Sequence, residues 1–272
     1  MTEKSILFDS TKCIACRACQ VACKQWNELP GEETNNRGSY ENPSDLSSNT
    51  WLKIRIIETE KQGMPNWTFS RQACMHCTDA ACVKVCPTKA LYHNELGMVS
   101  YDKDLCSGCG YCVDACPFHV PRSNRNLITG MAKMDKCTMC TSPGVDRIAA
   151  GYEPACVKTC PPYALKFGDR DQLVPEGTKR VQALKSQGYT NAYLYGEKEL
   201  DGLHVLYVLD NSPSVYGLPV NPQVPVITTA WKGVIQPLGW VLGGLTIVGL
   251  GLNYMVARQA KIARELHAEK EN

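Results

Sequence analysis

Apolar and polar positions alternate in one stretch of the N-terminal half, and this alternation predicts a β-hairpin. The segment 51–58 reads W-L-K-I-R-I-I-E, which has the period of two that a strand requires. A turn is expected at 63–66, and 67–71 is expected to return beside the first strand. The preceding segment 28–49 is polar and contains Gly, Pro, Asn and Ser, so it is predicted to be a long loop.

A second hairpin and one helix are predicted nearer the C-terminus. The strands of this hairpin are 193–195 and 204–209, and the Asp-Gly pair at 201–202 supplies a turn between them. Upstream, 177–187 is predicted to form a short helix that ends at Gly188, because glycine adopts the left-handed conformation common after a helix. The mixture of hairpins and short helices indicates an α+β domain.

A long apolar stretch near the C-terminus predicts a transmembrane helix. The 25 residues 233–257 contain no charge. As a helix they would be about 37 Å long at about 1.5 Å per residue, enough to cross a hydrocarbon core of about 30 Å. The alternative is a buried core helix. The expected domains are therefore 1–230, the span 231–258 and a tail 259–272. A G-x-x-x-G pair within the span either admits a neighbouring membrane helix or is the glycine that such spans tolerate.

The charges that flank this stretch predict its orientation. Arg258, Lys261 and Arg264 follow it, whereas only Lys232 precedes it closely. Positive residues favour the cytoplasmic side of a membrane. We therefore expect a single-pass protein with a cytoplasmic C-terminus and with the larger domain on the outer face.

Cysteine usage is the strongest chemical signal. The 272 residues have a formal net charge of +2, which indicates no nucleic-acid partner, but they include 16 cysteines. The start of the chain lacks the pattern of a signal peptide, so these thiols are expected to be reduced and available to metal. They fall into four quartets with none left over: Cys13, Cys16, Cys19 and Cys23; Cys74, Cys77, Cys82 and Cys86; Cys106, Cys109, Cys112 and Cys116; Cys137, Cys140, Cys156 and Cys160.

The spacing within the quartets predicts iron–sulfur clusters. The third quartet reads C-x2-C-x2-C-x3-C-P, the run that binds 4Fe–4S clusters in bacterial ferredoxins, and the others are variants of it. Zinc sites use separated pairs of cysteines, and neighbouring cysteines in one run are poorly placed to form disulfides. The chain also lacks a Walker loop, a dinucleotide fingerprint and an H-E-x-x-H motif. We therefore expect four 4Fe–4S clusters and electron transfer without catalysis.

The distances between quartets favour a nested arrangement. The second and third are separated by the 19 residues 87–105, which suits one compact ferredoxin-like lobe at about 70–120. The first and fourth quartets would then pair across it, in an outer lobe formed by 9–30 and 130–170. Sequential pairing of the quartets remains the alternative, because short connections are generally preferred.

Two-cluster ferredoxins also predict which cysteines share a cluster. Three cysteines of a run hold one cluster, and the fourth is expected to start a short helix and to bind the other cluster of the lobe. With nested lobes, the predicted ligand sets are Cys13, Cys16, Cys19 and Cys160; Cys137, Cys140, Cys156 and Cys23; Cys74, Cys77, Cys82 and Cys116; Cys106, Cys109, Cys112 and Cys86.

The chain resembles the four-cluster subunits of molybdopterin oxidoreductases, and more closely the β subunits of membrane-bound formate dehydrogenases of the N and O types. The resemblance covers almost the whole chain. It rests on C-I-A-C-R-A-C-Q-V-A-C-K-Q-W-N at 13–27, C-M-H-C at 74–77, G-C-G-Y-C at 108–112, C-P-F at 116–118, E-P-A-C-V-K-T-C-P at 153–161, H-V-L-Y-V-L at 204–209, Y-G-L-P at 216–219 and W-K-G at 231–233.

This resemblance implies partners as well as a fold. It implies the nested pairing, a catalytic α subunit with a molybdenum or tungsten pterin, and a membrane γ subunit, a cytochrome b, that passes electrons to quinone. It also implies a twin-arginine signal on the α subunit, which would carry the folded cluster domain to the outer side of a bacterial inner membrane. Two alternatives stay open: the β subunit of a dimethyl sulfoxide, polysulfide or thiosulfate reductase, and a metal-binding structural or regulatory protein.

Overall fold

The computed structural model describes residues 2–61, 63–125, 130, 132–142, 145–225 and 236–271. The chain divides into two units, Met1–Pro225 and Val226–Asn272, which are described separately. The strands of the first unit are β1 (Lys4–Asp9), β2 (Lys53–Lys61), β3 (Met64–Gln72), β4 (Leu91–His93), β5 (Val99–Tyr101), β6 (Arg122–Arg125), β7 (Ala132–Asp135), β8 (Thr141–Ser142), β9 (Val145–Asp146), β10 (Leu165–Asp169), β11 (Tyr193–Tyr195) and β12 (Val205–Leu209). Its helices are α1 (Ala18–Trp26), α2 (Ala81–Val85), α3 (Tyr111–Ala115), α4 (Ala155–Lys158), α5 (Arg170–Ser186) and the 3₁₀ turns η1 (Glu199–Asp201) and η2 (Pro213–Tyr216).

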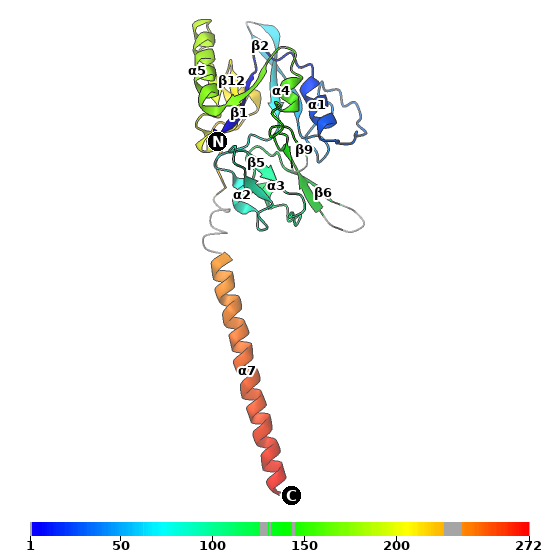
Figure 1. Ribbon diagram of the computed structural model, residues 1–272, viewed down its shortest axis with the longest axis vertical. Coiled ribbons are helices and arrows are strands. Elements are labelled where there is room, and N and C mark those ends of the chain that lie inside the picture. Colours follow the sequence, from blue (N-terminus) through cyan, green and yellow to red (C-terminus); the bar gives the residue numbers. More distant parts are fainter. Residues whose placement is uncertain are drawn as a thin grey trace. The chain divides into compact units, whose positions relative to one another are not determined.

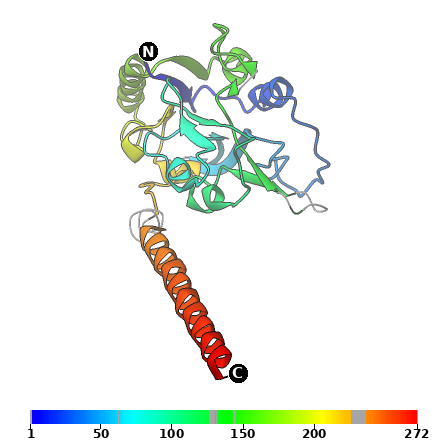
Figure 2. The same cartoon turned by 60° about the horizontal axis from the view of Figure 1, so that its bottom comes forward.

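A four-stranded sheet in the order β10-β1-β12-β11 supports one side of this unit. β1 is antiparallel to β10 and parallel to β12, so the N-terminal strand joins two segments from the far end of the unit. Successive residues of β1 face opposite sides of the sheet. Leu7 packs under α5, whereas Ile6 and Phe8 face the core that contains Cys19 and Cys156. Figure 1 and Figure 2 show α5 on the side of the sheet away from α1 and α4.

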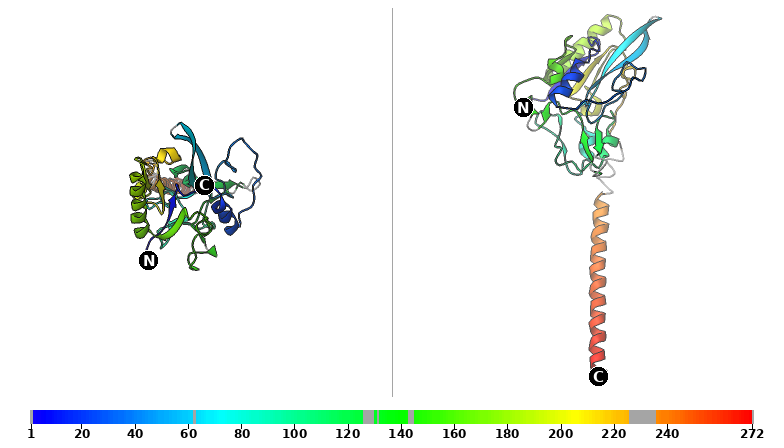
Figure 3. Two further views of the ribbon diagram at one scale, coloured as in Figure 1. Left: turned by 90° about the horizontal axis from the view of Figure 1, so that it is seen from above. Right: turned by 90° about the vertical axis from the view of Figure 1, so that its right-hand side faces the viewer.

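The first predicted hairpin is confirmed, and it is longer than predicted. β2 and β3 pair antiparallel from Lys53 with Gln72 to Lys61 with Met64. The predicted turn at 63–66 is therefore too long, because Met64, Pro65 and Asn66 already pair with β2. Side chains at the base of the hairpin are buried, whereas those near its tip are exposed. Figure 3 shows the tip projecting beyond the rest of the unit.

The helices beside the cysteines form two nested pairs, as the predicted fold class requires. α1 contacts α4 across the sequence, and α2 contacts α3. Figure 1 shows α1, α4 and β1 in one lobe and α2, α3 and β6 in the other. The prediction that the fourth cysteine of each run starts a helix is wrong. Each helix contains the third cysteine of its run, and the fourth lies at or near its C-terminal end. The proline after three of these helices cannot continue them.

The remaining predictions for the first unit are confirmed in part. β11 and β12 form the second hairpin, although the Asp-Gly pair lies at the end of the turn η1 rather than joining the strands directly. The predicted helix 177–187 is the second half of α5, which begins at Arg170 and continues through Pro175. The segment 28–49, which is fully described, contains no helix or strand.

The second unit contains the helix α7 (Gln236–Glu271). Its 25-residue segment Pro237–Lys261 is long and apolar enough to cross a membrane, and none of its most apolar part is buried. This helix fits the single C-terminal membrane anchor that the sequence predicts. The helix continues past residue 258 into the predicted tail. The residues Trp231, Lys232 and Gly233, which the predicted boundary and orientation used, lie outside the described residues.

Candidate functional site

The same backbone turn occurs in the first C-x2-C pair of each quartet. The residue immediately before the second cysteine has a positive φ: Ala15 (52°), His76 (48°), Gly108 (72°) and Met139 (57°). Consecutive amides around a left-handed residue form a concave nest that points N–H groups at an anion. These turns therefore shape the chain around a negatively charged group at four places.

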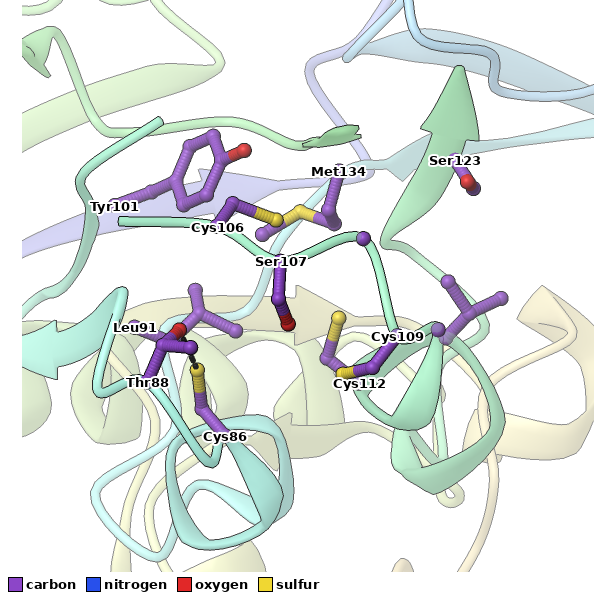
Figure 4. Close-up of a pocket in the computed structure, with 13 residues that line it drawn as sticks. Cys86, Thr88, Leu91, Tyr101, Cys106, Ser107, Cys109, Cys112, Ser123 and Met134 are labelled. Atoms are coloured by element: carbon purple, nitrogen blue, oxygen red, sulfur yellow. Dashed lines mark hydrogen bonds between the residues drawn. The ribbon is translucent and has the colours of Figure 1, made fainter. Parts of the chain in front are cut away.

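Three cavities in this domain are each lined by one set of four cysteines. In the first cavity, which Figure 4 shows, Cys86 at the end of α2 faces the loop with Cys106 and Cys109 and the start of α3, which carries Cys112. In the second and third cavities, the cysteines come from two segments that lie far apart in the sequence. These are Cys13, Cys16, Cys19 and Cys160 in the second cavity, and Cys23, Cys137, Cys140 and Cys156 in the third.

The fourth set consists of Cys74, Cys77, Cys82 and Cys116, which lie beside one another. Besides burial, the thiols of Cys74, Cys116 and Cys82 raise the pKa of Cys77. Burial raises the pKa of Cys116 to about 11. The structure therefore places the sixteen cysteines in four groups, each with three cysteines of one run and the fourth cysteine of another run.

The four sets are also neighbours in a fixed order. Cys19 of the second cavity interacts electrostatically with Cys156 of the third. Cys137 of the third cavity interacts with Cys74 of the fourth set. Cys82 of the fourth set interacts in turn with Cys112 of the cavity in Figure 4. The sets consequently form a series that starts at Cys13, Cys16, Cys19 and Cys160 and ends at Cys86, Cys106, Cys109 and Cys112.

Burial makes several of these thiols poor anions unless a cation joins them. Burial and, after it, neighbouring thiols raise the pKa of Cys19, of Cys112 and of Cys140 to about 12 in each case. Cys106 differs from these three, because the amides of Met134 and Gly108 lower its pKa although burial opposes them. A metal deprotonates the thiols that it binds, and its positive charge offsets the cost of burying them together.

The cysteine sets fit a four-iron cluster better than a single ion. Within the described residues, no three His, Cys, Asp or Glu side chains converge closely enough to hold one metal ion. In a 4Fe–4S cluster each thiolate binds a different iron, so the four sulfurs surround the group instead of meeting at one point. The cavity walls are mainly apolar, with Phe8, Ile54 and Leu165 in one and Leu91, Val113 and Met134 in another.

Two buried cations beside these sites were not expected from the sequence. Lys136 is 1% exposed, and its ammonium group donates to the carbonyl oxygens of Val99 (2.7 Å) and Cys137 (3.0 Å). Arg71, also 1% exposed, lines the cavity of Cys23, Cys137, Cys140 and Cys156. Their closeness to cysteines in the sequence was the available signal, since Lys136 precedes Cys137 directly and Arg71 lies three residues before Cys74.

Comparisons with known proteins agree with this chemistry. Residues 65–170 match a family described as a 4Fe-4S dicluster domain, and residues 12–90 match a second family of the same description. The chain is 40% identical to the formate dehydrogenase-O iron–sulfur subunit of Escherichia coli K12, over 99% of this chain and 89% of that protein. It is 40% identical to the iron–sulfur subunit of the nitrate-inducible formate dehydrogenase of the same strain, over 93% of this chain and 85% of that protein.

A third relative belongs to a different enzyme. The thiosulfate reductase electron transfer subunit PhsB of Salmonella typhi is 40% identical over 72% of this chain and 92% of its own length. The similarity to iron–sulfur subunits is therefore broader than one enzyme, but the two matches named first extend further along this chain.

Proposed function

The chain belongs to the iron–sulfur subunits of formate dehydrogenases, and on that premise we propose that it conducts electrons from a formate-oxidising pterin subunit to a membrane partner that reduces quinone. Members of this family carry 4Fe–4S clusters and transfer electrons without being the catalytic subunit. The single observation that supports a conducting role is that the four cysteine sets neighbour one another in series, with an exposed cysteine in the first set and in the last.

We propose the four sets as ligand sets, each holding one cluster that can gain and lose an electron. Support for the crossing of the fourth cysteine comes from Cys160, which lines the cavity of Cys13, and from Cys86, which lines the cavity of Cys109. Cys16 and Cys109 are the two exposed cysteines, and they belong to the first and last sets of the series. Electrons can therefore enter at one surface and leave at another, while the buried inner sets exclude water.

The membrane arrangement is also a proposal. The segment Pro237–Lys261 anchors the chain, and the positive residues that follow the apolar stretch favour a cytoplasmic C-terminus. The cluster domain, whose proposed bounds are 1–230, then lies on the outer side of a bacterial inner membrane. A catalytic subunit with its own export signal carries it there folded, and a cytochrome b subunit accepts the electrons.

Metal analysis and reduction by formate test this function together. The anaerobically purified complex is expected to hold about sixteen irons and sixteen acid-labile sulfides in this chain, four of each for every predicted cluster. Formate is expected to reduce these clusters, as followed by electron paramagnetic resonance, and a quinone analogue is expected to reoxidise them. Zinc in place of iron would refute the clusters. A different result would be iron-loaded protein that formate does not reduce but that thiosulfate reoxidises after chemical reduction. That result would indicate that the chain serves another pterin enzyme.

A further inference from the structure

Arg71 is a buried cation whose side chain lies beside cysteine thiols. It is 1% exposed, and its three guanidinium nitrogens make no hydrogen bond of ordinary geometry among the described residues, although the guanidinium group lies close enough to Cys156 and Tyr207 to lower the pKa of both against the effect of burial. Lys136, the other buried cation, instead donates to two backbone carbonyl groups. An unpaired polar group in a protein interior is costly, and an unpaired charge is more so. Arg71 therefore requires a negative group that its cavity is built to receive.

The hairpin places Arg71 at the boundary between two cysteine sets. In β2–β3, Arg71 pairs directly with Ile54, so both side chains lie on one face of the hairpin. Ile54 lines the cavity of Cys13, Cys16, Cys19 and Cys160, whereas Arg71 lines that of Cys23, Cys137, Cys140 and Cys156. The hydroxyl of Tyr207 in β12 donates to the backbone carbonyl of Arg71 at 2.6 Å and holds this position.

Arg71 remains charged at every pH at which the protein is folded. Burial alone lowers the pKa of a guanidinium group, but the neighbouring groups of Cys156, Tyr207 and Cys137 raise the pKa of Arg71 above its usual value. The usual value for arginine is already above about 12. Its positive charge is therefore permanent and does not depend on proton uptake.

We propose that Arg71 raises the reduction potential of the cluster held by Cys23, Cys137, Cys140 and Cys156. This inference rests on the ligand sets proposed above. When one electron moves into this cluster from a neighbour, the neighbour is oxidised by one electron, no bond is broken and no proton is required. The reduced state carries one more negative charge, so the fixed charge of Arg71 stabilises it more than the oxidised state. The low dielectric constant of the interior strengthens this effect, and hydrogen bonds donated by the guanidinium group to cluster sulfurs would act in the same direction.

The test is a redox titration of the complete membrane complex, followed by electron paramagnetic resonance. In Arg71→Gln, which removes the charge but keeps a polar side chain, the ratio of reduced to oxidised cluster at a fixed potential is expected to fall at least tenfold. For a one-electron couple this is a decrease of about 59 mV in midpoint potential. Arg71→Lys, which keeps the charge, is expected to restore most of the shift. The signal is assigned through Cys140→Ser, which alters the same cluster.

Lys179→Gln is the matched control, because it removes one exposed positive charge from α5 of the same domain. Solvent screens such a charge, so all four midpoint potentials are expected to stay unchanged. The proposal is wrong if Arg71→Gln keeps the wild-type midpoint, or if Arg71→Lys shifts it as far as Arg71→Gln does. Loss of this cluster in Arg71→Gln with retention in Arg71→Lys supports the charge, whereas loss in both variants makes the role structural and overturns the proposal. Iron and sulfide content, measured on the wild type, tests the proposed function separately.

Discussion

At the scale of single residues, the left-handed turns show why only part of a cluster site can be recognised from its cysteines. Gly108 is suited to such a turn, since glycine adopts positive φ at no steric cost. Ala15, His76 and Met139 adopt it as well, although L residues with a Cβ rarely do. The surrounding structure stabilises them, so the spacing of the cysteines predicts the site and the local residues do not predict its backbone.

Gly108 and Gly110 provide a matched test of this turn. Both have positive φ, but a Cβ at Gly108 would lie 2.1 Å from the Ala132 carbonyl oxygen, whereas one at Gly110 would meet nothing within 4 Å. Gly110→Ala is expected to cost about 1–2 kcal/mol from backbone strain alone. For a domain of this size that lowers the midpoint of thermal unfolding by about 2–8 °C. Gly108→Ala is expected to lower it further and to reduce iron content, and equal effects of the two variants would contradict this.

The cysteine ligands yield a prediction that separates nested from sequential pairing. Cys160→Ser is expected to perturb the same cluster as Cys13→Ser, and Cys86→Ser the same cluster as Cys109→Ser. The reason is that the fourth cysteine lines the cavity of the partner run. Electron paramagnetic resonance during a redox titration follows each cluster by its signal and midpoint.

Two outcomes would contradict this assignment. If Cys160→Ser alters the cluster that Cys137→Ser alters, the fourth cysteine does not cross. If Cys13→Ser and Cys86→Ser alter the same cluster, the quartets pair in sequence order. The five variants are therefore compared in one background, with iron content measured in each.

At the scale of elements, strands that pair with a neighbour in the sequence could be predicted, whereas a strand that pairs with distant segments could not. β2 and β3 are neighbours with an alternating pattern, and both were predicted. β1 was not, because its apolar run I-L-F is too short to show a period, and its partners β10 and β12 lie more than 150 residues away. The first half of α5 was missed because Pro175 and Gly177 resemble a turn. Both lie inside the helix, where Gly177 packs closely against Leu194 and Leu7.

The hairpin is expected to need its base but not its tip. The base carries Leu52, Ile54 and Arg71, which line cluster cavities, whereas the tip projects from the domain. Residues 58–67 can be replaced by Asn-Gly, which joins the paired residues Ile57 and Thr68. Pair types alternate along an antiparallel ladder, so this pair is of the same type as Lys61 with Met64, four positions along, and a two-residue turn suits it.

The shortened chain is expected to keep all four clusters, since no cavity-lining residue is removed. Iron and sulfide per chain and the four midpoint potentials are the measurements. A control with Ile54→Ala, which leaves the tip intact and opens the cavity wall, is expected to destabilise the domain by about 2–5 kcal/mol. Loss of a cluster in the shortened chain alone would show that the tip stabilises a site.

At the scale of the whole molecule, the nested lobes bring together segments that are distant in sequence. Cys13 and Cys160 line one cavity although nearly 150 residues separate them. Closing a loop of this length costs entropy, but the cost grows only slowly with length. Binding a cluster offsets it, because the free energy of metal binding contributes directly to folding. The sequence could propose the ligands because the spacing of the cysteines is itself the signal, but it could not propose Arg71, which lines a cavity that the nested lobes create.

Separation of the two units gives the last prediction. A chain that ends at Pro225 keeps the whole first unit and all sixteen cysteines, but lacks the apolar segment Pro237–Lys261. Expressed with its partners, it is expected to load four clusters and to accept electrons from the catalytic subunit, yet to appear in the soluble fraction and to fail to reduce quinone. A full-length control with Arg258→Gln keeps the span and is expected to stay in the membrane fraction. Membrane fractionation, iron content and formate-driven reduction of a soluble dye measure these properties separately. If the truncated chain, expressed without any partner, remains in the membrane fraction, α7 is not the anchor; if it loses its clusters, the two units do not fold independently.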